Sequence, residues 1–245
     1  MATQFSDLGV IAPIQKALKN LEITTPSDIQ QKVIPTLLTT KKDIVALAKT
    51  GSGKTVAFGI ALAEQLLGEI GGTPLSEKPL ALVIAPTREL ALQVSRELGW
   101  LYAKAGLRIA TCVGGMDASK ERRALRSGPA IVVGTPGRLR DHLERGPLDL
   151  SGLIGVVLDE ADEMLDMGFQ DDIIEIQEWC SNPELRSMIF SATVPSFIQE
   201  IAKESMENPV MIDLVGDDAA QLPSQLKNRA IIASSFDSKI AHIQN

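Results

Sequence analysis

The segment GVVLDEADEML, residues 155–165, runs a short apolar stretch directly into the carboxylates Asp159, Glu160 and Asp162. Carboxylates placed together can hold a divalent metal ion or transfer a proton. A buried strand that simply ends in solvated acids would produce the same residues. The choice between a ligand site and a solvated turn depends on the other motifs of the chain.

The segment AKTGSGKT, residues 48–55 and called the P-loop below, supplies the strongest of these motifs. It fits the pattern G-x-x-x-x-G-K-[ST], with alanine in place of the first glycine. Glycine lets backbone N–H groups face a phosphate, the lysine reaches the β- and γ-phosphates, and the threonine hydroxyl can bind Mg²⁺. A glycine-rich turn that binds no ligand would need neither the lysine nor the threonine. The predicted nucleotide-binding residues are Ala48, Lys49, Thr50, Gly51, Ser52, Gly53, Lys54 and Thr55.

Apolar runs alternate along the chain with segments of helical character. Continuous Val, Ile and Leu runs are typical of strands buried on both faces, and strand–helix alternation predicts a parallel sheet. The expected fold is therefore α/β, a P-loop domain with helices on both faces of the sheet. The predicted strands are 43–48, 80–86, 108–113, 130–136, 155–160, 187–193 and 210–215, and the predicted helices are 54–70, 88–106, 119–128, 137–146, 164–180 and 195–206. Residues 71–79 are expected to form a long loop.

This fold gives the acids at 159–162 a role. Ligands of open α/β sheets bind at the carboxyl ends of the strands, and a P-loop site takes a magnesium-binding acid from such an end. Asp159 is placed to bind the metal, and Glu160 to orient or deprotonate an attacking water.

Composition and charge argue against several classes of protein. The chain has 245 residues, 44% of them hydrophobic, and a formal net charge of -7. This charge argues against nucleic-acid binding through bulk positive charge, although a local face can still bind phosphates. Cys112, Cys180, His142 and His242 stand apart in sequence, which argues against structural zinc and disulfides. Without a signal peptide or a membrane-spanning run, a reducing, cytoplasmic setting is expected.

The combination of DEAD at 159–162 with the P-loop resembles the DEAD-box family of ATP-dependent RNA helicases, in particular its N-terminal RecA-like domain. Further segments resemble the family's motifs in the expected order, from about Phe5 to Ile212. They are TPSDIQ (25–30), PTRELA (86–91), GG (114–115), TPGR (135–138) and SAT (191–193).

The resemblance implies ATP and Mg²⁺ as cofactors and RNA as the partner, bound through its backbone. It implies catalytic roles for Lys54, Asp159 and Glu160, with Thr55 and Asp159 on the metal, partly through water. Adenine would be contacted by Phe5, Ile23 and Gln30, whose amide offers both a donor and an acceptor. The implied RNA contacts are Pro86, Thr87, Arg88, Gly114, Gly115, Thr135, Pro136, Gly137 and Arg138, and Ser191, Ala192 and Thr193 would couple hydrolysis to unwinding.

The chain departs from the family pattern in its Q motif. Glu22 and Ile23 stand where glycine and an aromatic residue are usual, and Asp28 replaces a common proline. An aliphatic residue packs on adenine without aromatic stacking, so a softer adenine preference is expected. Aromatic residues make up only 4% of the chain, which predicts RNA binding without base stacking.

Residues 1–215 are predicted to form the ATP-binding domain, and 216–245 a linker with the first strand of a second RecA-like domain, at 229–235. The family's second domain bears an arginine finger, worth about 10³–10⁵ in rate. The chain alone is therefore expected to be a monomer that binds nucleotide without unwinding RNA. A nucleotide-dependent binding module is the alternative, but it would not need Lys54, Thr55, Asp159 and Glu160 together. A P-loop ATPase unrelated to RNA would not need the other motifs.

Overall fold

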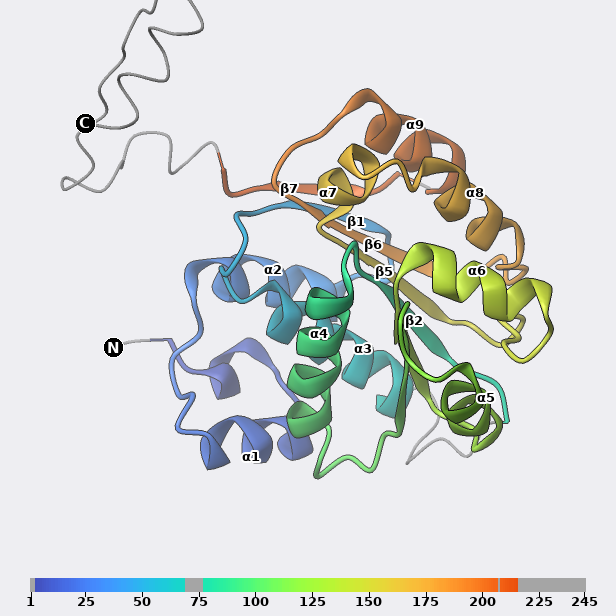
Figure 1. The fold of residues 1–245 in the computed structure, drawn as a ribbon. Coiled ribbons are helices and arrows are strands. Elements are labelled where there is room, and N and C mark those ends of the chain that lie inside the picture. The colour runs from blue at the N-terminus through green and yellow to red at the C-terminus, as the bar shows by residue number, and fades with distance from the viewer. Residues whose placement is uncertain (1–2, 69–76, 207, 216–245) are drawn as a thin grey trace, which may run out of the picture. The chain divides into compact units, whose positions relative to one another are not determined.

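The computed structural model describes residues 3–68, 77–206 and 208–215, which fold around one parallel sheet (Figure 1). All paired strands run parallel, in the order β3-β4-β2-β5-β6-β1-β7. The strands are β1 (Ile44–Leu47), β2 (Ala81–Ile84), β3 (Ile109–Cys112), β4 (Ile131–Gly134), β5 (Gly155–Asp159), β6 (Arg186–Ser191) and β7 (Val210–Asp213). The predicted α/β class is confirmed.

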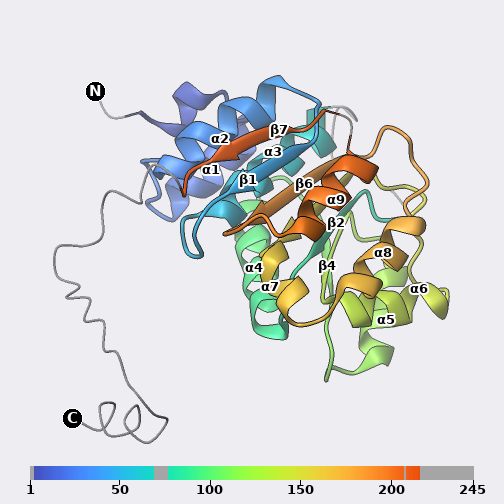
Figure 2. The same cartoon turned by 90° about the horizontal axis from the view of Figure 1, so that it is seen from above.

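Helices cover both faces of the sheet, α1–α4 on one side and α5–α9 on the other (Figures 1 and 2). The first group is α1 (Ala12–Asn20), α2 (Asp28–Thr39), α3 (Lys54–Gly68) and α4 (Arg88–Leu101), preceded by the short 3₁₀ helix η1 (Phe5–Leu8). The second group is α5 (Ala118–Arg126), α6 (Pro136–Glu144), α7 (Ala161–Asp166), α8 (Gln170–Glu178) and α9 (Ser196–Ser205). No helix in the described ranges is both long and apolar enough to cross a bilayer.

The strands bury both faces because their side chains alternate between two apolar cores. In β2, Ala81 and Val83 pack with α1–α4, whereas Leu82 and Ile84 pack with α5–α9. The continuous apolar runs of the sequence reflect this double burial.

Buried charges fix the amino ends of β1 and β6. Asp43, just before β1, accepts a hydrogen bond of 2.6 Å from the backbone N–H of Ser187. Arg186, which begins β6, donates to the carbonyls of Lys42 at 3.1 Å and Leu37 at 2.9 Å. These bonds hold the two strands in register at the edge opposite the P-loop.

Two predicted helices end earlier than expected. The predicted helix 164–180 is divided into α7 and α8, because Gly168 adopts a left-handed φ of 83° that ends α7. The predicted helix 88–106 ends at Leu101, where the Tyr102 hydroxyl donates a 2.7 Å hydrogen bond to the Gly59 carbonyl of α3. Residues 69–70 of the predicted helix 54–70, residues 71–76 of the predicted loop and the predicted strand 229–235 lie outside the described residues.

Candidate functional site

The strand order divides the carboxyl edge of the sheet into two halves. One half holds the loops after β1, β6 and β5, which carry the P-loop, the SAT motif and the DEAD motif. The other half holds the loops after β2, β4 and β3, which carry PTRELA, TPGR and the two glycines. The fold therefore gathers the motifs predicted to bind nucleotide in one half and those predicted to bind RNA in the other.

The P-loop follows β1 and leads into the amino terminus of α3. Gly51 and Gly53 have φ values of 76° and 95°, which L side chains rarely adopt. A Cβ at Gly53 would lie 2.6 Å from the amide nitrogen of Gln30 and would displace that amide. The Ser52 hydroxyl is buried without a hydrogen-bond partner among the described residues. The site thus combines open backbone, a free hydroxyl and a helix terminus, which suits an anion.

Ser27 and Gln30 brace the P-loop from α2. The Ser27 hydroxyl donates to the Ser52 carbonyl at 2.8 Å, and the Gln30 amide nitrogen donates to the Gly53 carbonyl at 3.1 Å. The Gln30 amide oxygen accepts from the Ser27 N–H at 2.9 Å. Each end of the Gln30 amide keeps one further hydrogen-bonding position for a ligand. Our sequence analysis missed the role of Ser27, although S-x-x-Q before an apolar run is a capping-box signal.

Lys54 and Glu160 form a buried ion pair between α3 and the end of β5. Their Nζ and Oε2 atoms lie 2.7 Å apart, and each side chain is 5% exposed. Lys54 also contacts the carbonyl of Ala48 at 3.4 Å. Glu160 has a φ of 54°, an uncommon conformation for a residue other than glycine and one that recurs at functional sites. The lysine predicted to bind phosphates therefore has Glu160 as its partner in this structure.

Asp159 is almost fully buried beside this pair. Burial raises the pKa of its carboxyl to about 7, while the Lys54 charge opposes that shift and the Glu160 charge adds to it. One carboxylate oxygen, Oδ1, has no hydrogen-bond partner among the described residues. A buried carboxylate with a free oxygen suits a divalent cation, which would also favour its ionised form. Thr55, half-buried in the first turn of α3, is the hydroxyl predicted to share such an ion.

The SAT motif after β6 is bonded to the DEAD motif after β5. The backbone N–H and the hydroxyl of Thr193 both donate to Asp162 Oδ2 at 2.9 Å. The buried Ser191 hydroxyl accepts from the Asp162 N–H at 3.2 Å. Partial burial raises the pKa of Asp162, but the hydrogen bonds from Thr193 and Ser191 outweigh it, and the net shift is downward. We had assigned Asp162 no role, because a sequence cannot show which acid meets the next strand. Ala192, between the two hydroxyl residues, is half-buried.

Of the two apolar residues predicted to contact adenine, one is buried in the core and the other packs against it. Phe5 is 4% exposed and packs in the core on the α1–α4 side of the sheet. Ile23 is partly buried against the same core. Their contact with a base stays a prediction.

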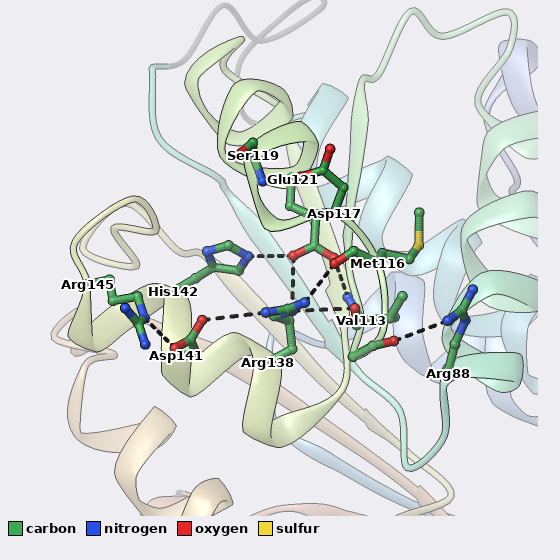
Figure 3. Close-up of polar contacts among 11 residues, drawn as sticks. Arg88, Val113, Met116, Asp117, Ser119, Glu121, Arg138, Asp141, His142 and Arg145 are labelled. Carbon is green, nitrogen blue, oxygen red and sulfur yellow. Dashed lines mark hydrogen bonds and ion pairs between the residues drawn. The ribbon is translucent and has the colours of Figure 1, made fainter.

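In the other half of the edge, Arg88 lies exposed at the start of α4 and donates to the Gly114 carbonyl at 3.4 Å (Figure 3). Thr87 and Thr135 occupy the N-cap positions of α4 and α6, and the Thr87 hydroxyl accepts from the Leu90 N–H at 3.2 Å. Among the predicted RNA contacts, the exposed residues are Arg88, Gly114, Gly115 and Gly137, the half-buried ones are Thr87, Thr135 and Arg138, and the buried ones are Pro86 and Pro136. The two prolines therefore support these loops from the protein interior.

Arg138 is turned toward the protein interior and is 18% exposed. Its guanidinium donates to the carbonyls of Val113 at 3.4 Å and Met116 at 2.9 Å. It also lies 3.2 Å from a carboxylate oxygen of Glu121 and 3.6 Å from one of Asp141. Its Nε and Nη2 atoms therefore donate within the protein, and two carboxylates balance its charge.

The fold brings together Cys112, Glu121 and His142, which are separate in sequence. One potential ligand atom from each lies within 4.8 Å of the others, and all three residues are buried. Arg138 already occupies the position of a cation beside the carboxylate. Burial raises the pKa of the Cys112 thiol to about 12, with a further rise from Glu121, so the thiol stays protonated. We therefore interpret this cluster as a buried polar network.

A change at Asp162 tests the link between the DEAD and SAT motifs. Because the folded pKa of Asp162 is lowered, its stabilisation is present above the unfolded value of about 3.9 and is lost as pH falls through the folded pKa. We expect Asp162→Asn to lower the free energy of unfolding by about 0.5 kcal/mol at neutral pH, since the contact is solvent-screened. Urea unfolding between about pH 3 and about pH 8 measures it, and the difference should vanish at the acid end. Asp166→Asn, the same change at an exposed α7 position, is the control; a pH-independent difference for Asp162→Asn would contradict the link.

Comparison with known proteins places these motifs in a family. A model described as DEAD/DEAH box helicase matches residues 27–201. ATP-dependent RNA helicase DeaD of Escherichia coli (strain K12) is 46% identical over 208 residues, 84% of this chain and 32% of that protein. DEAD-box ATP-dependent RNA helicase CshA of Geobacillus kaustophilus is 42% identical over 210 residues, 86% of this chain and 43% of that protein. The chain thus spans less than half the length of either relative.

A solved structure agrees with these sequence matches. The crystal structure of a DEAD box protein from the hyperthermophile Methanococcus jannaschii aligns with a TM-score of 0.77 and 41% identity, covering 86% of this chain and 55% of that one. The expected RecA-like fold and the family resemblance of the motifs are confirmed, and the chain belongs to the DEAD/DEAH box helicase family.

Proposed function

We propose that this chain is the nucleotide-binding, N-terminal part of an ATP-dependent RNA helicase, which binds ATP with Mg²⁺ at the ends of β1 and β5. The observation that carries the proposal is Lys54, buried in the P-loop with Glu160 at 2.7 Å and the free oxygen of Asp159 nearby. A pure binding module would not need an acid placed to act on water beside a metal-binding carboxylate.

Lys54 changes partner when nucleotide binds, according to this proposal. A buried ammonium group needs an anion, which Glu160 supplies in this structure. The phosphates of ATP offer a stronger one together with the backbone N–H groups of the P-loop. Lys54 then leaves Glu160, whose carboxylate becomes free to orient a water and accept its proton. The same lysine thus holds the general base inactive until the phosphates arrive.

Asp159, Thr55 and the Ser52 hydroxyl complete the proposed site. Asp159 and Thr55 would hold Mg²⁺, partly through water, and the ion neutralises developing charge on the phosphates when bound. The unpartnered Ser52 hydroxyl is placed to donate to a phosphate oxygen. Hydrogen bonds between Asp162 and the SAT residues would transmit a shift at Glu160 to β6, since Glu160 immediately precedes α7.

RNA would bind along the loops after β2, β4 and β3, through exposed backbone, hydroxyl groups and Arg88. Such contacts read phosphate and sugar rather than base identity. We propose a monomeric chain in the cytoplasm, where the unpaired Cys112 and Cys180 stay reduced.

Substitutions at the ion pair test the proposed partner change. Lys54→Ala should weaken ADP binding in Mg²⁺ by about tenfold or more, because it removes the cation aimed at the phosphates. Glu160→Gln should instead strengthen it by about threefold, because the competing anion is gone. Titration with a fluorescent ADP analogue measures both. Lys16→Ala on the exposed face of α1 makes the same charge change as the first variant and should bind normally. Weaker binding by both site variants would exclude the partner change.

A substitution at Gln30 tests whether the site prefers adenine to guanine. We expect Gln30→Ala to abolish a modest preference for ATP over GTP, because the free positions of the amide would pair with adenine. Ser27→Ala is the matched control, since it removes the hydroxyl bond to Ser52 but leaves the Gln30 amide in place. It should lower the affinity for both nucleotides alike. Competition of ATP and GTP against a labelled nucleotide gives the ratio, and an unchanged ratio in Gln30→Ala would remove the adenine assignment.

We propose that this chain needs a second RecA-like domain to hydrolyse ATP at a significant rate. Alone, it should release phosphate near background and should not separate a duplex, because the arginine finger that stabilises the transferring phosphoryl is proposed to come from a second RecA-like domain. Adding the second RecA-like domain of a family member should raise RNA-stimulated phosphate release by at least about 10³. Duplex unwinding by the 245 residues alone would contradict the two-domain proposal.

A further inference from the structure

The loop of residues 113–117, called the glycine loop below, joins β3 to α5 and carries Gly114 and Gly115. Both glycines are exposed, so a ligand can reach the loop backbone. Gly115 has a φ of 75°, and a Cβ there would lie 2.8 Å from a guanidinium nitrogen of Arg88. The Arg88 guanidinium therefore lies against the glycine loop, bonded to the Gly114 carbonyl at 3.4 Å.

The opposite side of the glycine loop is held by α6. Arg138 donates to the carbonyls of Val113 and Met116, which flank the two glycines of the loop (Figure 3). The backbone N–H of Thr135 also donates to the Cys112 carbonyl at 3.1 Å. One planar guanidinium thus spans the loop from beneath, which requires that it be held in one orientation.

Glu121 of α5 holds the Arg138 guanidinium in one orientation. It is buried, and its Oε2 forms an ion pair with Arg138 Nε at 3.2 Å and a hydrogen bond with His142 Nε2 at 2.7 Å. Its Oε1 accepts from the Val113 N–H at 2.9 Å. The buried Glu121 carboxylate therefore joins the residue after β3, Val113, to two residues of α6, Arg138 and His142.

We propose that Glu121 is a positioning residue for RNA binding, which acts through Arg138 to hold the glycine loop beside Arg88. This inference rests on the proposed function, in which these loops contact the RNA backbone. Arg138 then contributes less as a phosphate contact than as the support of the loop. The motif analysis assigned RNA roles to Arg88, Gly114, Gly115 and Arg138, but gave none to the acid that arranges them.

The chemistry of the contacts makes a carboxylate necessary at this position. A glutamine has one oxygen and one NH₂ group in place of two acceptors. Whichever way the amide is turned, its NH₂ group faces a donor, either the Val113 N–H or the Arg138 guanidinium. Glu121→Gln therefore loses at least one buried bond to a charged or backbone donor and releases one end of the network.

Positioning and simple charge predict opposite results for this variant. Glu121→Gln removes a negative charge beneath a surface proposed to bind phosphates. If charge alone mattered, RNA affinity would rise, as it does when repulsion is relieved. If Glu121 positions the glycine loop, affinity falls despite the more favourable charge.

The experiment measures binding of the full chain to a short fluorescein-labelled oligouridine by anisotropy at low salt. We expect Glu121→Gln to weaken RNA binding by about tenfold, with fluorescent-ADP affinity unchanged. Amide hydrogen exchange should accelerate in the glycine loop and not in the P-loop. Glu178→Gln makes the same charge change at an exposed end of α8 and should leave RNA affinity at the wild-type level.

A second variant, Arg138→Lys, separates support from phosphate contact. It keeps the positive charge but cannot reach both carbonyls and Glu121 in the arginine geometry. RNA binding reduced as in Glu121→Gln supports the proposal. Wild-type affinity in either variant, or tighter binding by Glu121→Gln, overturns it. If the wild-type chain itself does not bind RNA, the proposed function fails, and the inference with it.

Discussion

Lys54 is a buried ammonium group, and a buried charge needs an opposite charge within reach in every state of the protein. The end of β5 meets this need through Glu160, which accepts an uncommon backbone conformation to do so. The pair joins the P-loop to the DEAD motif across the end of β6, which lies between β1 and β5 in the sheet. The ion pair neutralises the buried charge of Lys54, and a phosphate can take the place of Glu160 as the partner of Lys54.

Other buried charges organise the rest of the sheet in the same manner. Asp43 and Arg186 join the amino ends of β1 and β6, while Glu121 and Arg138 join the loops at the ends of β3 and β4. Each of these side chains bonds to backbone groups of a neighbouring element. Such contacts are directional, so they fix where a loop lies, whereas apolar packing alone would tolerate small shifts.

In the half of the carboxyl edge that carries the P-loop, the DEAD motif and the SAT motif, β6 lies between β1 and β5. Thr193 and Ser191 meet Asp162 there, so the end of the sheet's central strands is a connected set of hydrogen bonds. In contrast, the glycine loop is supported from α5 and α6 and has its own buried network. The chain thus holds its two candidate surfaces by separate means on a common sheet.

The sequence by itself determined the fold class, because continuous apolar runs separated by helical segments leave a parallel sheet as the way to bury both faces. It also determined the phosphate-binding and acidic motifs, since glycine spacing, a lysine and carboxylates are local patterns. It did not predict the break between α7 and α8, where a single glycine ends a helix inside a helical pattern. Only the tertiary structure decided which residues meet across strands: Ser27 with the P-loop, Asp162 with Thr193, and Glu121 with Arg138. Glu121 lies in a segment rich in charges, and its burial depends on Arg138 and His142 arriving from α6, contacts that no local pattern encodes.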